Sequence, residues 1–92
     1  MWYDSTMPEI SRFFGIVIAM FYSDHEPPHF HVRYGSQKAR FAIEDLRMLD
    51  GDLKPRARGL VVEWATLHQE ELRREWESAR ERKPLFPIAP LD

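Results

Sequence analysis

The chain has 92 residues, a length that suits one hydrophobic core and leaves no room for a second domain. Its formal net charge of −2 gives no global attraction to nucleic acid, and the absence of cysteine excludes disulfides. We see neither a charged-then-apolar leader nor an apolar run near the roughly 18 residues of a membrane span. We therefore expect one domain over residues 7–92, located in the cytoplasm and making no membrane contact.

The first residues and the first strong apolar segment have different characters. Residues 1–6, MWYDST, precede a second methionine and a proline, so we expect them to be an extension or a disordered start. From Gly15 the run GIVIAMFY is apolar on both alternating faces and rich in β-branched and aromatic residues. This composition predicts a central strand that is covered on both sides.

Two further strands are predicted on either side of a short turn. After Pro27 and Pro28 end the preceding loop, HFHVRY (29–34) alternates strictly between apolar residues and residues that carry imidazole or guanidinium groups. QKARFAI (37–43) repeats the alternation. A two-residue turn at Gly35 and Ser36 joins them, with glycine supplying the positive φ.

The same turn predicts how these two strands pair. Val32 should lie opposite Ala39 and Phe30 opposite Phe41, so that both apolar faces coincide. On the other face Arg33 should lie opposite Lys38, and His31 opposite Arg40. With His29, this outward face gathers three cations and two histidines.

The remaining elements complete an α+β domain. A short fourth strand over residues 46–49 is expected, followed by one long helix from Pro55 to about Arg82, although a break near His68 stays open. The tail KPLFPIAPL contains three prolines and should be extended, packed on the helix or sheet or against a second copy of the chain. The predicted architecture is an N-terminal antiparallel sheet of three or four strands packed on one C-terminal helix, with an extended Pro-rich tail.

The helix and the tail should supply large core side chains. On the helix, Trp64 and Trp76 are interpreted as core anchors whose indole N–H groups need hydrogen-bond acceptors, and His68 as a hydrogen-bonding residue at the core edge. In the tail, four apolar side chains should be at least partly buried. Each one that is fully buried would contribute about 1.5 to 3 kcal/mol to the stability of the fold. These tail residues are Leu85, Phe86, Ile88 and Leu91.

Three of the four histidines fall within the segment DHEPPHFH, which is the most unusual feature of the chain. His29 and His31 share a strand face and could supply two metal ligands, with Asp24 or His25 arriving from the loop. None of the familiar zinc or metalloprotease spacings is present, so no metal site is favoured and no cofactor is expected.

Two other interpretations of this segment are open. His29 or His31 could act as general acid or base in RNA cleavage, with Arg33 stabilising the anionic intermediate. Alternatively the loop could be an internal brace, in which Asp24 accepts hydrogen bonds from His25 or from backbone amides. Enzymatic activity stays undecided, and a non-enzymatic role is favoured.

The outward face of the two central strands is the second candidate site. It carries His29, His31, Arg33, Lys38 and Arg40, and it is either a solvated sheet face or an anion-binding surface. Its anionic partner could be the phosphates of nucleic acid, bound weakly and with little sequence preference, or an acidic protein.

Several segments resemble one known family. ISRFFGIVIAMFYSDHEPPHFHVRYG, LVVEWATLHQEELRREWESAR and PLFPIAPL are similar to the bacterial family named domain of unknown function 4160, over almost everything from Met7 to Leu91. The family's central motif falls on Asp24, His25, Pro27, Pro28, His29, Phe30 and His31, and its helix motif on Glu63, Trp64, Glu71, Leu72 and Trp76. The resemblance implies a small bacterial protein, often suggested to belong to a toxin–antitoxin-like gene pair, and transfers no catalytic residues.

The leading hypothesis is a non-enzymatic interaction module of such a gene pair. It would bind a small cognate protein, with nucleic acid as a further candidate ligand, through the basic, histidine-containing sheet face. A homodimer is also open. The alternative is a toxin-like nuclease, metal-dependent or histidine-based, centred on DHEPPHFH.

Overall fold

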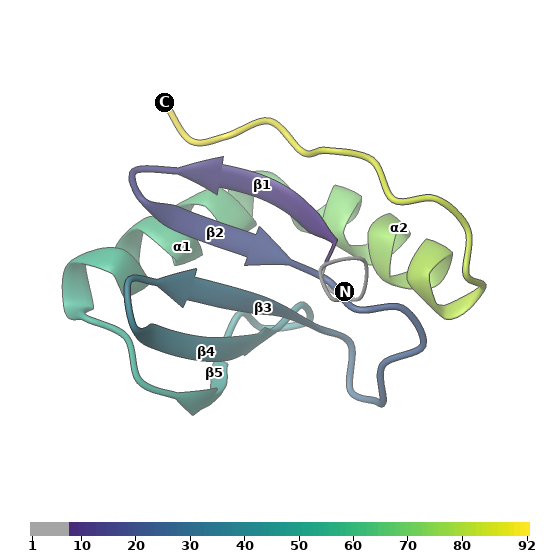
Figure 1. The fold of residues 1–92 in the computed structure, drawn as a ribbon, viewed down its shortest axis with the longest axis horizontal. Helices are drawn as coiled ribbons and strands as arrows, with labels where there is room; N and C mark the ends of the chain where they lie inside the picture. The colour runs from purple at the N-terminus through teal and green to yellow at the C-terminus, as the bar shows by residue number, and fades with distance from the viewer. Residues whose placement is uncertain (1–7) are drawn as a thin grey trace.

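Within residues 8–92, five strands form one antiparallel sheet in chain order, and two helices cover one of its faces (Figure 1). The structure is a computed structural model that describes residues 8–92, so the expectation for residues 1–6 lies outside the described residues. The strands are β1 (Glu9–Phe13), β2 (Ile16–Ala19), β3 (His29–Tyr34), β4 (Gln37–Ala42) and β5 (Met48–Gly51). The helices are α1 (Pro55–Leu67) and α2 (Gln69–Arg80). The α+β class is confirmed.

The register of β3 against β4 is the one that the sequence predicts. Phe30 lies opposite Phe41 and Val32 opposite Ala39, while His31 faces Arg40 and Arg33 faces Lys38. Strand β2 is buried at all four positions, as expected for a central strand. Gly35 occupies the turn with a φ of 61°.

The expected number of strands was too low, because β1 was not predicted. Its alternation is interrupted by a register shift between Glu9 and Ser11, which leaves Ile10 and Ser11 both buried. The turn from β1 to β2 uses Phe14 and Gly15, both with positive φ, so Gly15 belongs to the turn and not to the strand. The fifth strand was expected over residues 46–49 and lies slightly later in the chain.

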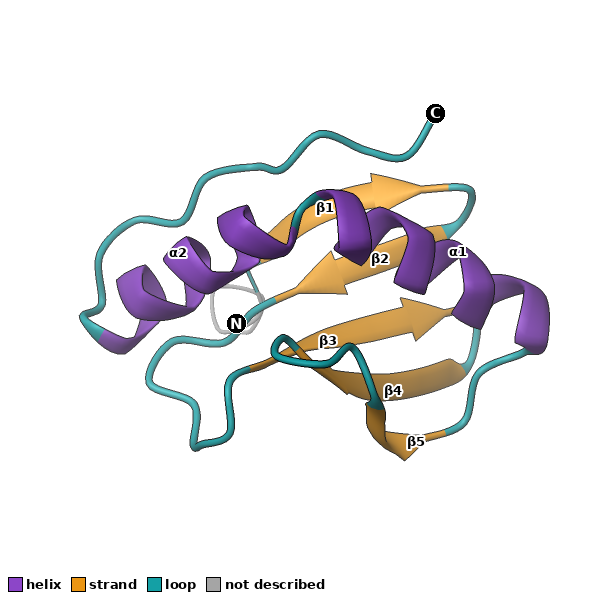
Figure 2. Cartoon of the chain, turned by 180° about the vertical axis from the view of Figure 1, so that it is seen from behind, coloured by secondary structure: helices purple, strands orange, loops and turns teal. Residues whose placement is uncertain are grey.

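The helical region is two helices, whereas one long helix was favoured from the sequence and a break near His68 was left open. The break falls at His68, whose φ of −120° and ψ of 23° leave the helical range. Directly after it, the Gln69 side-chain amide donates to the carbonyl oxygens of Ile43 and Glu44, at 2.6 Å and 2.9 Å. These bonds tie the start of α2 to the loop after β4, and α2 takes a new direction (Figure 2).

The core lies between the helices and the inner face of the sheet. Trp64 is fully buried among aromatic rings of the sheet, with Phe13 at 5.4 Å and Phe30 at 6.0 Å between ring centroids. Its indole N–H donates to the carbonyl of Ala89 at 2.8 Å, as expected for a buried tryptophan. Trp76 is buried too, but its Nε1 has no hydrogen-bond partner among residues 8–92, contrary to the prediction.

The proline-rich tail runs back across α2 and along β1 (Figure 1). Ile88 is buried, and its amide donates to the carbonyl of Ile10 at 2.7 Å, so the tail covers the free edge of β1. The prediction that the tail packs on the domain is confirmed. Phe86 is an exception, because 66% of it is exposed. No helix within residues 8–92 has the length and apolar character that crossing a membrane requires.

Candidate functional site

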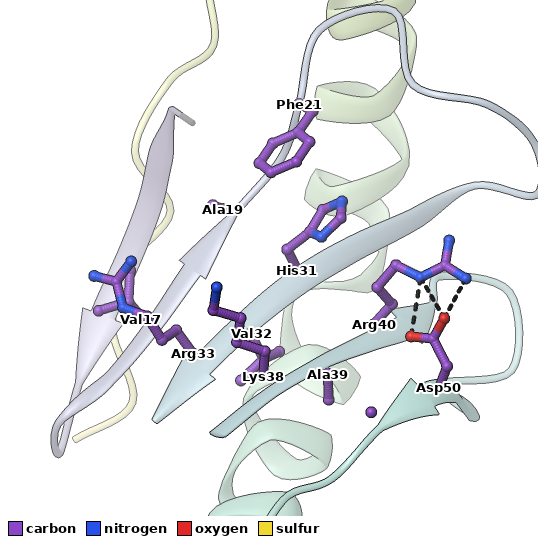
Figure 3. Close-up of a pocket in the computed structure, with 11 residues that line it drawn as sticks. Val17, Ala19, Phe21, His31, Val32, Arg33, Lys38, Ala39, Arg40 and Asp50 are labelled. Carbon is purple, nitrogen blue, oxygen red and sulfur yellow. Dashed lines mark hydrogen bonds and ion pairs between the residues drawn. The ribbon is translucent and has the colours of Figure 1, made fainter. Parts of the chain in front are cut away.

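A groove of about 440 Å³ lies on the outer face of the sheet, opposite the helices (Figure 3). The pairing of β2 with β3 places Val17 opposite Arg33 and Ala19 opposite His31 on this face. Because Val17 and Ala19 are small and apolar, they form a low floor on β2, beside the longer side chains of β3. The lining residues are Val17, Ala19, Phe21, His31, Val32, Arg33, Lys38, Ala39, Arg40, Asp50 and Gly51.

The positive charge of the groove is smaller than the sequence predicts. Asp50 accepts hydrogen bonds from the Arg40 guanidinium at 2.6 Å and 3.0 Å, so Arg40 is neutralised by a residue of the same chain. This pairing lowers the pKa of the Asp50 carboxyl and raises that of Arg40. Arg33 and Lys38 have no ion-pair partner within the part of the chain that the structure describes. The expectation of three uncompensated cations is therefore corrected to two.

Asp50 is a groove residue that sequence reasoning missed. The register of β5 against β4 places it directly opposite Arg40. Next to it, Gly51 has a φ of 100°, and a Cβ there would lie 2.3 Å from the carbonyl oxygen of Lys38. The acidic turn at Asp50, Gly51 and Asp52 was the available signal, but the register that brings it to Arg40 depends on a pairing that local sequence does not encode.

The loop before β3 brings three side chains of the histidine-rich segment together. Asp24 Oδ2 lies 2.9 Å from His29 Nε2 and 3.0 Å from His31 Nε2. Donor atoms of these three residues all lie within 4.8 Å of one another. The other oxygen, Oδ1, accepts a hydrogen bond from the His25 amide at 2.8 Å, as the brace interpretation predicts. His25 is mostly exposed and is not part of this three-residue cluster.

His29 does not contribute to the groove, although its strand position suggests that it should. It is fully buried, its ring lies against Trp76 of α2 at 5.3 Å, and it is absent from the groove lining. Its Nδ1 lies 2.7 Å from the carbonyl oxygen of Pro27. The five residues predicted as one binding face thus divide into four around the groove and one beneath the loop.

His31 connects the groove with the cluster. Its ring stacks on Phe21, with centroids 4.0 Å apart and an angle of 14° between the planes. Burial lowers the pKa of His31, and the hydrogen bond to Asp24 offsets only part of this effect. Burial alone would raise the pKa of Asp24, but hydrogen bonds from His31 and the His25 amide outweigh it, so that pKa is lowered. At neutral pH the favoured state is therefore a neutral His31 imidazole facing an ionised Asp24 carboxylate.

The remaining candidate residues have structural roles. His68 bonds through Nδ1 to Glu71 at the start of α2, which confirms its predicted hydrogen bond at the core edge. Phe21 was not identified from sequence, because its contact with His31 depends on the path of the loop that follows β2.

The fold and site together define a small α+β domain, with a meander sheet, two helices on one face and a histidine-bordered groove on the other. The chain belongs to the family described as Domain of unknown function (DUF4160), whose sequence pattern matches residues 15–77. The match confirms the resemblance over a shorter span, which includes DHEPPHFH but neither β1 nor the tail. Searches of curated proteins and of solved structures found no match.

Proposed function

We propose that this chain is a non-enzymatic interaction module that binds a small cognate protein through the outer-face groove, as one member of a toxin–antitoxin-like gene pair. The observation that carries the proposal is the combination of an apolar floor with two cations that have no ion-pair partner among residues 8–92. The ligand that this surface suits is an extended segment with alternating apolar and acidic side chains.

The groove separates the two kinds of contact that such a segment needs. Val17 and Ala19 line the groove with apolar side chains on β2, the strand that lies beside β3. Arg33 and Lys38 stand opposite each other on β3 and β4, so their like charges repel until an anion is bound. A partner carboxylate would relieve this repulsion and gain two charge-assisted hydrogen bonds.

The charge of the groove favours protein over nucleic acid. Two free cations would neutralise only about two phosphates, and such binding falls to a low level at physiological salt. Arg40 adds little to the attraction, because Asp50 already holds it. The net charge of −2 gives no further attraction to a polyanion.

Charge reversal in the groove tests the proposal. We would co-express the chain with the product of the small gene adjacent to its own, and measure binding of the purified proteins by calorimetry. The double variant Arg33→Glu and Lys38→Glu should weaken the Kd about tenfold or more, because like charges now meet across the interface. The matched control reverses Arg58 and Arg74, exposed cations on the two helices, and should leave the Kd unchanged.

Equal binding by the groove double variant and the native chain would refute the proposal. A second arm replaces the protein partner with fluorescent single-stranded RNA or duplex DNA at physiological salt. We expect no saturable binding to either. Tight binding that Arg33→Glu abolishes would assign the groove to nucleic acid instead.

One observation favours the nuclease as a second candidate, namely the convergence of His29 and His31 on Asp24. Against it, His29 is fully buried and its Nδ1 is occupied by the Pro27 carbonyl, so it cannot exchange protons with a substrate in the groove. We expect purified protein to leave RNA and DNA intact with or without divalent metals. Cleavage that His31→Ala abolishes would establish the nuclease instead.

A further inference from the structure

The buried ring of His29 is held in one tautomer. Its Nδ1 lies 2.7 Å from the Pro27 carbonyl oxygen, which can only accept a hydrogen bond. The ring hydrogen of neutral His29 is therefore on Nδ1, and Nε2 carries a lone pair. Metal-binding histidines usually donate their other ring N–H to a carboxylate, a backbone carbonyl or a water molecule.

The other nitrogen of His29 faces an atom with which it cannot pair. Nε2 is buried and lies 2.9 Å from Asp24 Oδ2, yet it makes no hydrogen bond of acceptable geometry within residues 8–92. When His29 is neutral and Asp24 is ionised, both atoms are hydrogen-bond acceptors. A proton on Nε2 would make the contact an ion pair, but that N–H would still form no hydrogen bond of acceptable geometry with Oδ2. A metal cation bound to both atoms would take up the two electron pairs.

The distances from the Asp24 carboxylate to the two imidazoles fit the spacing of metal ligands. Donors about 2.1 Å from one ion stand about 3.0 to 3.4 Å from each other in octahedral or tetrahedral geometry. Asp24 Oδ2 is 2.9 Å from His29 Nε2 and 3.0 Å from His31 Nε2. The second carboxylate oxygen is fixed by the His25 amide, so Oδ2 stays directed at the imidazoles.

We infer that Asp24, His29 and His31 form a binding site for one divalent first-row transition metal ion such as Zn²⁺. Two imidazoles and one carboxylate are the donor set that such ions take, and they leave further coordination positions open. On binding, the ion replaces the hydrogen that His31 Nε2 shares with Asp24, and His31 carries its hydrogen on Nδ1. His25, considered with the others from sequence, is not required. This inference is independent of the proposed protein partner.

The test uses the full chain after treatment with a chelator. Zn²⁺, Co²⁺, Ni²⁺ and Mn²⁺ are titrated separately by calorimetry, and visible absorption of the Co²⁺ sample reports its coordination. We expect one ion per chain for at least one metal. Asp24→Asn keeps the side-chain shape and the acceptor for the His25 amide, and it should weaken the Kd about 100-fold or more, as should His31→Ala, since losing outer partners alone costs about 10- to 100-fold.

The matched control is His68→Ala, which removes a histidine beside a carboxylate far along the chain from the cluster. It should bind the metal as the native chain does. Histidine ring ¹⁵N spectra of the Zn²⁺ form should show zinc at Nε2 of both His29 and His31. The inference is overturned if none of the four ions binds at millimolar concentration, or if Asp24→Asn and His31→Ala bind as tightly as the native chain.

Discussion

Glu75 is a buried carboxylate on α2 whose protonation is coupled to folding. Burial raises its pKa, the hydrogen bond from the Phe86 amide at 2.9 Å offsets part of the shift, and Glu71 adds to it. Because the folded pKa lies above the unfolded one, the folded state holds this proton more tightly. The resulting stabilisation is complete below the unfolded pKa and is lost as the pH rises through the folded pKa.

We therefore expect Glu75→Gln to raise the free energy of unfolding at pH 7, because glutamine keeps the acceptor for the Phe86 amide and carries no charge. The gain should shrink as the pH falls through the raised pKa of Glu75. Urea unfolding at several pH values measures it. Glu63→Gln, an exposed change of the same kind on α1, should show no comparable trend. A variant that is destabilised at pH 7 would contradict this expectation.

The positions of single site residues could be predicted where they follow from the alternation along one strand and from one turn. His31, Arg33, Lys38 and Arg40 occupy their predicted register positions because the turn at Gly35 fixes the pairing of β3 with β4. The neutralisation of Arg40 by Asp50 depends on a further strand pairing, and the burial of His29 depends on how α2 packs on the sheet. Neither follows from local periodicity.

At the scale of elements, β5 depends on the absence of a side chain at Gly51. A Cβ there would lie 2.3 Å from the Lys38 carbonyl oxygen and 2.5 Å from Ala39 Cα, and the φ of 100° is unfavourable for other residues. We expect Gly51→Ala to destabilise the domain by about 2 kcal/mol or more, and to loosen β5 and the Arg40–Asp50 pair.

The matched control is Gly59→Ala in α1, where a Cβ would meet nothing within 4 Å. This exposed helix position should gain about 0.5 to 1 kcal/mol, because alanine favours the helix and glycine does not. Thermal unfolding of both variants gives the comparison. Similar stabilities for the two would contradict the role of Gly51.

The two-helix arrangement depends on Gln69. Removing the side-chain amide by Gln69→Ala breaks two hydrogen bonds to backbone carbonyls of the loop after β4, so we expect a loss of about 1 to 3 kcal/mol. Glu70→Ala, next to it and bonded only to the exposed Arg73, should cost less than about 0.5 kcal/mol. Denaturant unfolding distinguishes the two, and equal losses would contradict the tethering role.

Secondary-structure elements could be predicted where their hydrophobic periodicity was regular. Strands β3 and β4 alternate cleanly, and the helical region has the right apolar spacing. Strand β1 contains a register shift that breaks the period of two, and the break at His68 is set by a tertiary contact of Gln69. Periodicity along the chain carries no sign of that contact.

At the scale of the whole molecule, the tail joins the helices to the first edge of the sheet. Ile88 is buried between them and bonds to Ile10, while the carbonyl of Ala89 accepts the Trp64 indole. Ile88→Ala should cost about 2 to 4 kcal/mol, because it leaves a cavity in the core. Phe86→Ala, at an exposed position of the same tail, should cost much less; equal losses in thermal unfolding would contradict this packing.

The two faces of the sheet have different roles in the molecule. The helices cover the inner face and the tail covers the edge at β1, which leaves the groove of β2, β3 and β4 as the surface for a partner (Figures 1 and 3). Backbone amide NMR of the full chain, titrated with the adjacent gene's protein product, tests most directly whether the partner binds in the groove. We expect the largest shift changes at Ala19, Arg33 and Lys38. Changes confined to α1, α2 and the tail would contradict the account.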